Sequence, residues 1–340
     1  MGITLVKLPD EEKIRPLPFY LTMEEWIARK APEGDYFFMW QVNPTVIFGR
    51  NQQIDTEVNI TYCREHGIEF YRRKSGGGCV FADMDNIMFS YITPADEVQT
   101  TFHAYAARVA EMLCGLGLKA EAGGRNDVMI GGRKVSGNAF YHIPGRSIVH
   151  GTMLYSTNMH HMLNAITPSR SKLESKKVKS VASHITTISE HLPTLKIEDF
   201  KRYAADFMAD DEWVLSEKDI REIEEMSKPY FTERWIEGKW KGEPVDAAKR
   251  IEGAGEFTVI LCLDDEGRID DVNLQGDFFL LQDADEMLFE ILRGIRPDED
   301  SIRTAISGKK VEEIISGLSN DAFVNLISEA AGRIRENPGD

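Results

Sequence analysis

Cysteine is scarce in this chain, and the few residues present follow no metal-binding or redox pattern. The four cysteines are Cys63, Cys79, Cys114 and Cys262, and no two of them form a Cys-x-x-Cys pair. Zinc sites and dithiol redox centres commonly contain such pairs, whereas disulfide scaffolds have more cysteines in shorter chains. We therefore expect free thiols in a reducing compartment.

The chain also lacks excess positive charge and long apolar runs. Its formal net charge is −16, whereas binding to nucleic acids or anionic membranes needs a positive field. No uncharged apolar run approaches the roughly 20 residues that span a bilayer, and residues 1–21 contain no apolar segment typical of a signal peptide. These absences predict a soluble cytoplasmic protein that binds neither nucleic acid nor membrane.

The chain does contain enough apolar residues, over enough length, for more than one domain. Hydrophobic residues make up 42% of its 340 residues, which suffices for a packed core, and one domain usually takes roughly 100–200 residues. Glycine, proline and charge are concentrated at residues 242–255, which marks a boundary. We predict a large first domain over residues 1–245 and a small α+β second domain over residues 250–340.

Apolar periodicity indicates short strands mixed with helices in the first domain. Strands are expected over residues 36–41, 45–49, 68–73, 79–82, 86–93, 127–130, 134–136 and 147–155, and helices over residues 102–116, 197–208 and 216–226. Gly131 and Gly132 separate two β-rich runs, and they predict a hairpin because a tight primed turn needs positive φ at both positions. In the second domain we expect a hairpin over residues 257–263 and 269–274, then helices over 286–293, 301–307 and 321–333.

Two arginines precede three consecutive glycines in the segment RRKSGGG, residues 72–78. Glycines let the backbone approach a ligand closely, with N–H groups directed at anionic oxygens, and arginines can bind phosphate or carboxylate in a bidentate manner. The spacing is neither that of a Walker A loop nor that of a dinucleotide fingerprint. By itself, the segment fits a turn with solvated arginines about as well as an anion site.

A lysine, Lys134, follows the predicted hairpin turn, and Asp127 precedes it. A lysine in this place could hold a carboxylate against an α-phosphate and stabilise developing charge. Asp127 could bind Mg²⁺, which prefers one or two carboxylates together with phosphate oxygens. Taken alone, either residue also suits a solvated surface.

A basic stretch and one histidine complete the set of candidates. The basic residues are Arg170, Lys172, Lys176, Lys177 and Lys179, with Glu174 as a single acid among them. This local reversal of charge suits an anionic ligand such as a triphosphate, although a solvated loop has the same composition. His150, followed by Gly151 and Thr152 on an expected strand, could contact a ligand or be a hydrogen-bonded core histidine.

Together and in this order, the motifs resemble those of the lipoate–protein ligase family. The matching segments are RRKSGGGCVF (72–81), ND (126–127), RKVSG (133–137), HGT (150–152) and KSVASHIT (179–186). Each motif alone is unspecific, but five in register are specific. The resemblance implies an α+β fold: a biotin/lipoate-ligase-like catalytic domain, with a mixed β-sheet flanked by helices, and a C-terminal accessory domain.

The resemblance also implies a two-step reaction. Lipoate would attack the α-phosphate of ATP to give lipoyl-AMP and pyrophosphate, and a carrier lysine would then attack the mixed anhydride. Lys134 would be the catalytic residue. The implied nucleotide-binding residues are Arg72, Arg73, Ser75, Gly76, Gly77, Gly78, Cys79, Val80, Phe81 and Lys134, and the implied lipoate-binding residues are Arg72, Gly77, Lys134, Gly137, His150, Gly151 and Thr152.

The implied ligands are ATP and lipoate as substrates, with Mg²⁺, and the implied partners are lipoyl carrier domains. Such carriers are the acyltransferase subunits of 2-oxoacid dehydrogenases and the glycine-cleavage carrier protein. The chain departs from the common family pattern where Ala82 and Asp85 replace a histidine and a glycine, and where Ala182 and His184 stand in place of arginine.

Other functions compete with this interpretation. An acyltransferase that moves octanoyl or lipoyl groups between carriers without ATP would need a nucleophilic cysteine, and no cysteine lies between Cys114 and Cys262. A biotin ligase is less well supported, because its basic, tryptophan-containing glycine loop is missing. A catalytically degenerate acyl-binding protein is a third hypothesis, and the presence of Lys134 argues against it.

Overall fold

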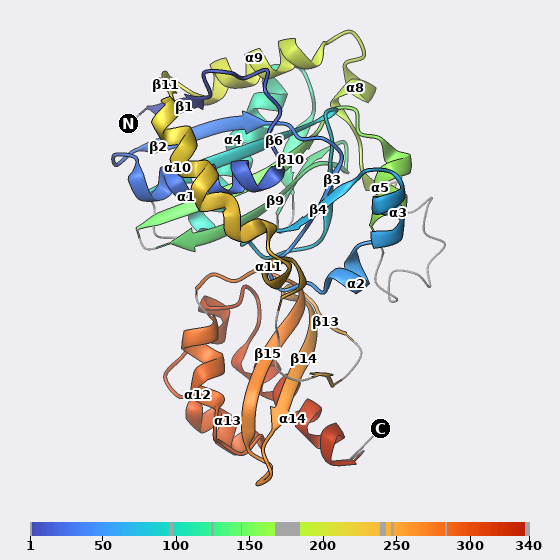
Figure 1. Ribbon diagram of the computed structural model, residues 1–340, viewed down its shortest axis with the longest axis vertical. Coiled ribbons are helices and arrows are strands. Elements are labelled where there is room, and N and C mark those ends of the chain that lie inside the picture. Colours follow the sequence, from blue (N-terminus) through green and yellow to red (C-terminus); the bar gives the residue numbers. More distant parts are fainter. Residues whose placement is uncertain are drawn as a thin grey trace. The chain divides into compact units, whose positions relative to one another are not determined.

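The fold is described from a computed structural model (Figure 1). The structure describes residues 2–94, 98–123, 126–143, 145–166, 184–238, 243–245, 248–282 and 284–336. The chain divides into two compact units. The first comprises Met1–Phe48, Ile54–Arg73 and Cys79–Ile236, and the second comprises Gly49–Gln53, Lys74–Gly78 and Glu237–Asp340. Two short segments from the first half of the chain, one of them the glycine run, therefore cluster with the C-terminal part.

A mixed sheet of eight strands, within the described residues, forms the centre of the first unit in the order β11-β1-β2-β6-β10-β9-β8-β7. The strands are β1 (Ile3–Lys7), β2 (Asp35–Trp40), β6 (Asn86–Thr93), β7 (Ala120–Gly123), β8 (Asp127–Ile130), β9 (Arg133–Ile143), β10 (Arg146–Leu154) and β11 (Asp211–Val214). β1 pairs in parallel with β2 and β11, and the other neighbours are antiparallel. Gly131 and Gly132, with φ of 56° and 76°, form the β8–β9 turn, which confirms the predicted hairpin.

Helices cover both faces of this sheet. On one face α1 (Leu17–Lys30) lies beside α10 (Glu217–Ser227) (Figure 1), and both contribute to one apolar core with β2. On the other face α4 (Val98–Gly115) packs Phe102 against Phe140 of β9 with ring centroids 5.5 Å apart, and α9 (Ile197–Met208) packs against α4. The predicted helices over 102–116, 197–208 and 216–226 are confirmed, although α4 begins four residues earlier than expected.

A second, smaller sheet of the first unit carries the arginine pair at one strand end. Its order is β4-β3-β5, with β3 (Thr45–Phe48), β4 (Glu69–Arg72) and β5 (Val80–Ala82). The short helices α2 (Ile54–Glu57), α3 (Ile60–Glu65) and α5 (Met159–Ala165) contribute to its apolar core. The first unit is completed by α8 (Ile188–His191), the 3₁₀ turn η1 (Lys228–Phe231) and α11 (Glu233–Glu237).

The second unit is an antiparallel sheet with helices packed on it. Its strands are β12 (Glu243–Pro244), β13 (Lys249–Ile251), β14 (Gly255–Leu263) and β15 (Ile269–Phe278). Its helical segments are the π-helix η2 (Asp285–Phe289), α12 (Glu290–Leu292), α13 (Glu299–Ala305), the 3₁₀ turn η3 (Val311–Glu313) and α14 (Asn320–Glu336). The predicted hairpin is confirmed, whereas the helix expected over 286–293 is a π turn followed by a short α-helix. None of the helices in the described ranges is both long and apolar enough to cross a membrane.

Candidate active site

Lys134 and Asp127 form an ion pair across the β8–β9 hairpin. Lys134 Nζ lies 2.7 Å from Asp127 Oδ1, and about a third of each side chain is exposed. Gly137 makes this geometry possible, because a Cβ at that position would stand 2.6 Å from Lys134 Cε and Nζ. The lysine therefore folds back over a glycine to reach the carboxylate.

A β-bulge directs Lys134 to this place. The pairing register between β8 and β9 shifts between Val128 and Met129. Val128 pairs with Ser136 and Met129 pairs with Lys134, so Val135 is the extra residue on β9. In a regular strand Lys134 and Gly137, three residues apart, would face opposite sides of the sheet. Bulges re-aim side chains in this manner, and here the bulge brings the lysine amine onto the face of Gly137.

The same face of the sheet carries two further predicted residues. Gly137 pairs with Asp127 on one side and with Thr152 on the other, and directly paired residues share a face. The Gly137 N–H donates to Thr152 Oγ1 at 3.3 Å. His150 lies two residues before Thr152, so its side chain shares this face as well.

Gly151 has a different role in the strand. It faces the opposite side, and a Cβ there would stand 1.9 Å from Asn138 Oδ1 and 2.9 Å from the Gly137 carbonyl oxygen. The glycine of the HGT segment therefore allows β9 and β10 to pack closely beside Gly137. It contributes no functional side chain.

His150 belongs to a buried polar network that begins on α1. Its Nδ1 lies 2.8 Å from Glu24 Oε2, and Glu24 and His150 are 0% and 5% exposed. Ser90 Oγ donates to Glu24 Oε1 at 2.6 Å, and Trp40 Nε1 donates to Ser90 Oγ at 2.9 Å. Of the two alternatives for His150, its Nδ1 atom therefore fits that of a hydrogen-bonded core histidine. Sequence reasoning missed Glu24, because α1 is buried around most of its surface and shows no polar stripe.

Both arginines of the RRKSGGG segment are buried. Arg72, 3% exposed, donates from Nε to the Trp235 carbonyl at 3.0 Å and from Nη2 to the Ile236 carbonyl at 3.0 Å. Its guanidinium also lies 4.8 Å from the centroid of the Phe48 ring. Arg73, 4% exposed, donates from Nη1 to the Ile47 carbonyl at 3.1 Å. The alternative of a turn with solvated arginines is therefore wrong.

The glycine run itself, in the second unit, packs closely against the end of β15. The Gly77 N–H, at φ +85°, donates to the Phe278 carbonyl at 2.8 Å. A Cβ at Gly76 would stand 2.2 Å from that carbonyl oxygen, and one at Gly78 would stand 2.9 Å from Asp277 Oδ2. The buried Ser75 accepts a backbone hydrogen bond from Arg50 at 3.0 Å. In this structure the lack of side chains at Gly76 and Gly78 accommodates β15, a requirement that the sequence pattern did not indicate.

The residues after the glycine run form β5. Val80 and Phe81 pair with Ile47 and Val46, and Phe81 is 2% exposed within the core of the small sheet. The Phe81 side chain therefore belongs to this core, and its carbonyl accepts a hydrogen bond from Asn86 Nδ2 at 3.4 Å. Cys79 is half-buried.

Two of the thiols, those of Cys63 and Cys114, show no arrangement for nucleophilic catalysis in the described residues. Burial raises the pKa of the Cys63 thiol to about 11, which suppresses the reactive thiolate. Cys114 is exposed near the end of α4, where its Sγ lies 3.3 Å from the Ala120 carbonyl oxygen. Within the described part of the chain each of these thiols contacts a backbone carbonyl, that of Ala165 for Cys63 and that of Ala120 for Cys114, instead of the cation or base that an acyl-transferring thiol needs.

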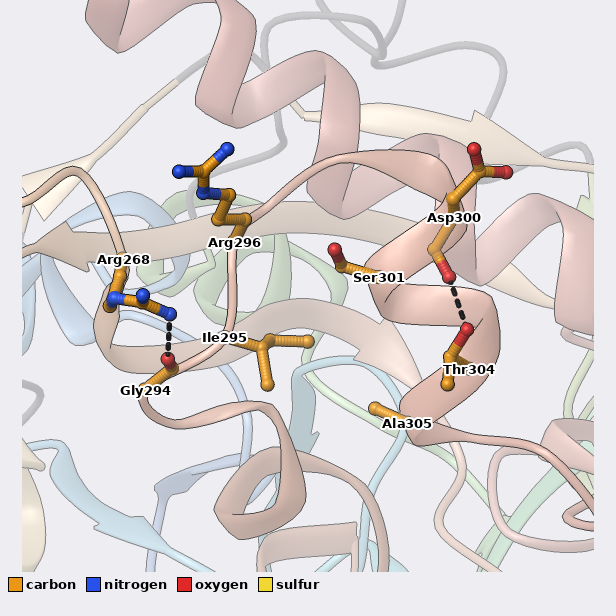
Figure 2. A pocket seen from close by; sticks show the side chains of 8 residues that line it. All are labelled: Arg268, Gly294, Ile295, Arg296, Asp300, Ser301, Thr304 and Ala305. Carbon is orange, nitrogen blue, oxygen red and sulfur yellow. Dashed lines mark hydrogen bonds between the residues drawn. The ribbon is translucent and has the colours of Figure 1, made fainter.

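The second unit also carries a shallow depression of about 490 Å³ that contains none of the predicted site residues (Figure 2). Its polar groups are largely engaged within the unit: Arg268 Nη1 donates to the Gly294 carbonyl at 3.0 Å, and Ser301 Oγ donates to Asp298 Oδ2 at 3.0 Å. The basic residues Arg170, Lys172, Lys176, Lys177 and Lys179 lie outside the described residues, as does Ala182.

A mixed sheet that presents a lysine paired with a carboxylate beside a glycine suits an enzyme that stabilises negative charge without using a protein nucleophile. Two family models match the chain: "Lipoyl protein ligase A/B catalytic domain" over residues 17–209 and "Bacterial lipoate protein ligase C-terminus" over residues 245–327. The lipoate-protein ligase LplJ of Bacillus subtilis is 32% identical, over 94% of this chain and 98% of its own. Lipoate–protein ligase 1 of Staphylococcus aureus is 31% identical, over 91% and 95%. The chain belongs to the lipoate–protein ligase family.

Solved structures agree with the fold. LipL1 of P. falciparum, solved in complex with lipoate, has a TM-score of 0.74 at 18% identity and covers 96% of this chain and 98% of its own. A bipartite lipoate protein ligase from Thermoplasma acidophilum, described with its E2 lipoyl domain, has a TM-score of 0.63 at 25% identity, covering 72% and 99%. A lipoate-protein ligase A bound with ATP has a TM-score of 0.59 at 23% identity, covering 69% and 98%. The predicted fold, a mixed sheet flanked by helices with a C-terminal α+β domain, is confirmed.

Proposed function

We propose that this enzyme activates lipoate, or octanoate, with ATP and transfers the acyl group to a lysine of a lipoyl carrier domain. In the first step a carboxylate oxygen of the acid attacks the α-phosphorus of ATP, and pyrophosphate leaves. In the second step the amine of the carrier lysine attacks the acyl carbon, and AMP leaves. Residues 1–245 form the catalytic domain of this proposal, and residues 250–340 form the accessory domain.

The observation that carries the proposal is the position of Lys134. Negative charge develops on the phosphate oxygens and on the departing pyrophosphate as the acyl–phosphate bond forms, and a fixed cation stabilises that charge. Lys134 is held by Asp127 at 2.7 Å on a bulged hairpin and remains 35% exposed. It is therefore positioned by the protein and still accessible to a ligand.

The nucleotide is assigned to the segment around the glycine run. Arg73 and the backbone of Gly78, Cys79, Val80 and Phe81 would hold the nucleotide, and Arg72, Ser75, Gly76 and Gly77 would shape this site. Support for this assignment comes from the family membership and from the two arginines beside the glycine run, since guanidiniums form strong charge-assisted hydrogen bonds with phosphate.

Lipoate is assigned to the sheet face that leads to Lys134. Lys134 would contact the carboxylate end, with Gly137 and Thr152 beside it, and His150 further along the same face. Gly151 faces the other side of the sheet and would act only by letting β9 and β10 pack closely beside Gly137.

Asp127 fits Mg²⁺ in a limited way. No group of three histidine, cysteine or acidic side chains in the described ranges could hold a metal ion. A single carboxylate suits Mg²⁺ only when phosphate oxygens and water complete the octahedron, so Asp127 would hold the ion together with the nucleotide. Mg²⁺ would neutralise phosphate charge there.

The second step needs an exposed lysine amine, and the bipartite ligase from Thermoplasma acidophilum is described with its E2 lipoyl domain. The proposed partners are the lipoyl domains of 2-oxoacid dehydrogenase acyltransferase subunits and the glycine-cleavage carrier protein. The ATP-independent transferase is less well supported, because burial raises the pKa of the Cys63 thiol to about 11 and no cysteine lies between Cys114 and Cys262 in the sequence.

The test is lipoylation of a purified carrier domain, followed by intact-protein mass spectrometry with and without ATP. We expect modification only with ATP, and a loss of about 10²–10³ in rate for Lys134→Ala. The matched control is Lys196→Ala, an exposed lysine of the same unit, which should act at the wild-type rate. Transfer without ATP from a pre-loaded carrier would favour the transferase, and no transfer under either condition would favour a degenerate binder.

A further inference from the structure

The backbone of Lys134 is held by the last two residues of the KSVASHIT segment, Ile185 and Thr186, to which the sequence analysis gave no role. β10 pairs with β9 only as far as Ser136, while β8 occupies the other edge of β9 at Lys134. Ile185 forms a parallel bridge to Lys134 on the edge of β9 that β10 no longer covers. The Thr186 N–H donates to the Lys134 carbonyl at 2.8 Å. The segment Ile185–Thr186 therefore continues the sheet beside the lysine.

Thr186 is itself fixed by a buried hydroxyl. The residue is 0% exposed, its Oγ1 donates to Glu190 Oε2 at 3.0 Å, and it lies 2.9 Å from His191 Nε2. Because the single hydroxyl proton goes to Glu190, His191 Nε2 carries the proton of the second hydrogen bond. The Thr186 hydroxyl is thus hydrogen-bonded to two side chains, those of Glu190 and His191.

The same carboxylate reaches the residue before the lysine. Glu190 Oε2 lies 2.9 Å from Arg133 Nη1, and Arg133 Nη1 lies 3.4 Å from the Ile185 carbonyl oxygen. This ion pair is about 40–50% exposed, and exposed pairs contribute little to stability. The buried Thr186 hydroxyl is therefore the principal anchor, and Glu190 connects it to Arg133.

We propose that Thr186 and Glu190 are positioning residues for Lys134, which they hold through its backbone in the geometry that adenylation needs. This proposal rests on the proposed role of Lys134. The lysine lies at a bulge, next to the two-glycine turn of the hairpin, where a strand has little stiffness of its own. The anchor supplies that stiffness, because a shift of about 1 Å at a reacting group can cost about 10²-fold in rate.

The test is acid-dependent pyrophosphate release by Thr186→Val, which removes the hydroxyl and keeps the volume and the backbone N–H. We expect kcat to fall about 10-fold, with the KM values for ATP and lipoate within about twofold of wild type. Thr186→Ser should restore most of the rate. The matched control is Thr22→Val: Thr22 is 1% exposed and its hydroxyl has no partner in the described structure, so kcat should not change.

A double-mutant cycle with Lys134→Ala separates positioning from a general structural role. If the threonine acts through the lysine, Thr186→Val causes no further loss in the Lys134→Ala background. An equal 10-fold loss in both backgrounds, or a loss confined to KM, would overturn the proposal and leave the role of Lys134 intact. A wild-type rate for Lys134→Ala alone would instead overturn the proposed function, and this inference with it.

Discussion

Gly137→Ala tests the geometry of the site without removing any functional group. A Cβ at residue 137 would stand 2.6 Å from Lys134 Cε and Nζ, whereas carbon atoms pack at about 3.5–4.0 Å. The lysine end must therefore retreat by about 1 Å. A displacement of that size costs about 10²-fold in rate, which corresponds to about 2.7 kcal/mol of activation free energy.

The same substitution should leave the free energy of unfolding nearly unchanged. Gly137 has no positive φ, so alanine fits the backbone, and the loss of chain entropy in the unfolded state favours alanine by about 0.4–1 kcal/mol. Weakening a part-exposed ion pair costs less than about 1 kcal/mol. The two effects are similar in size and opposite in sign.

The assay combines thermal denaturation with the initial rate of lipoate-dependent pyrophosphate release. The control is Gly332→Ala, where a Cβ meets no atom within 4 Å, and it should keep full activity. A Gly137→Ala enzyme with the wild-type rate would show that the folded-back position of Lys134 is not the active one. A large loss of stability would show that the strand, and not the lysine, absorbs the strain.

Three further predictions concern burial and close packing. His150→Ala should lower the free energy of unfolding by about 1–3 kcal/mol, as measured by urea denaturation, because it removes the His150 hydrogen bond from the buried Glu24 carboxyl group; an unchanged midpoint would contradict the network. Cys114 should react with an alkylating reagent in the native protein at about pH 8, whereas Cys63, with its raised pKa of about 11, should react only after unfolding; mass mapping of the labelled thiols checks the order. Gly76→Ala should destabilise the protein, because its Cβ would stand 2.2 Å from a backbone oxygen; a wild-type melting temperature would count against that contact.

The sequence predicted local features well where a short-range rule applies. The turn at Gly131 and Gly132 follows from the need for positive φ. A serine followed three residues later by an aspartate is likewise typical of a helix start, and Ser216 and Asp219 form a capping box at α10. The order of the motifs indicated the family. These features depend on neighbours in the chain, so no knowledge of tertiary contacts was required.

The missed features depend on tertiary contacts. α1 is buried around most of its surface, so its sequence has no amphipathic period to reveal Glu24 as a partner of His150. The bulge beside Lys134 depends on the register of two strands, and its anchoring by Thr186 depends on a segment about fifty residues away. The packing of Gly76 against β15 likewise joins distant parts of the chain.

The most direct test of the account is the exchange of labelled pyrophosphate into ATP by the purified enzyme in the absence of any carrier. Exchange reports reversible formation of an acyl-adenylate and does not require the second step. The account predicts exchange that depends on lipoate or octanoate, does not occur with biotin, and is lost in Lys134→Ala. No exchange with any of these acids would contradict ATP-dependent acid activation as the function of this protein.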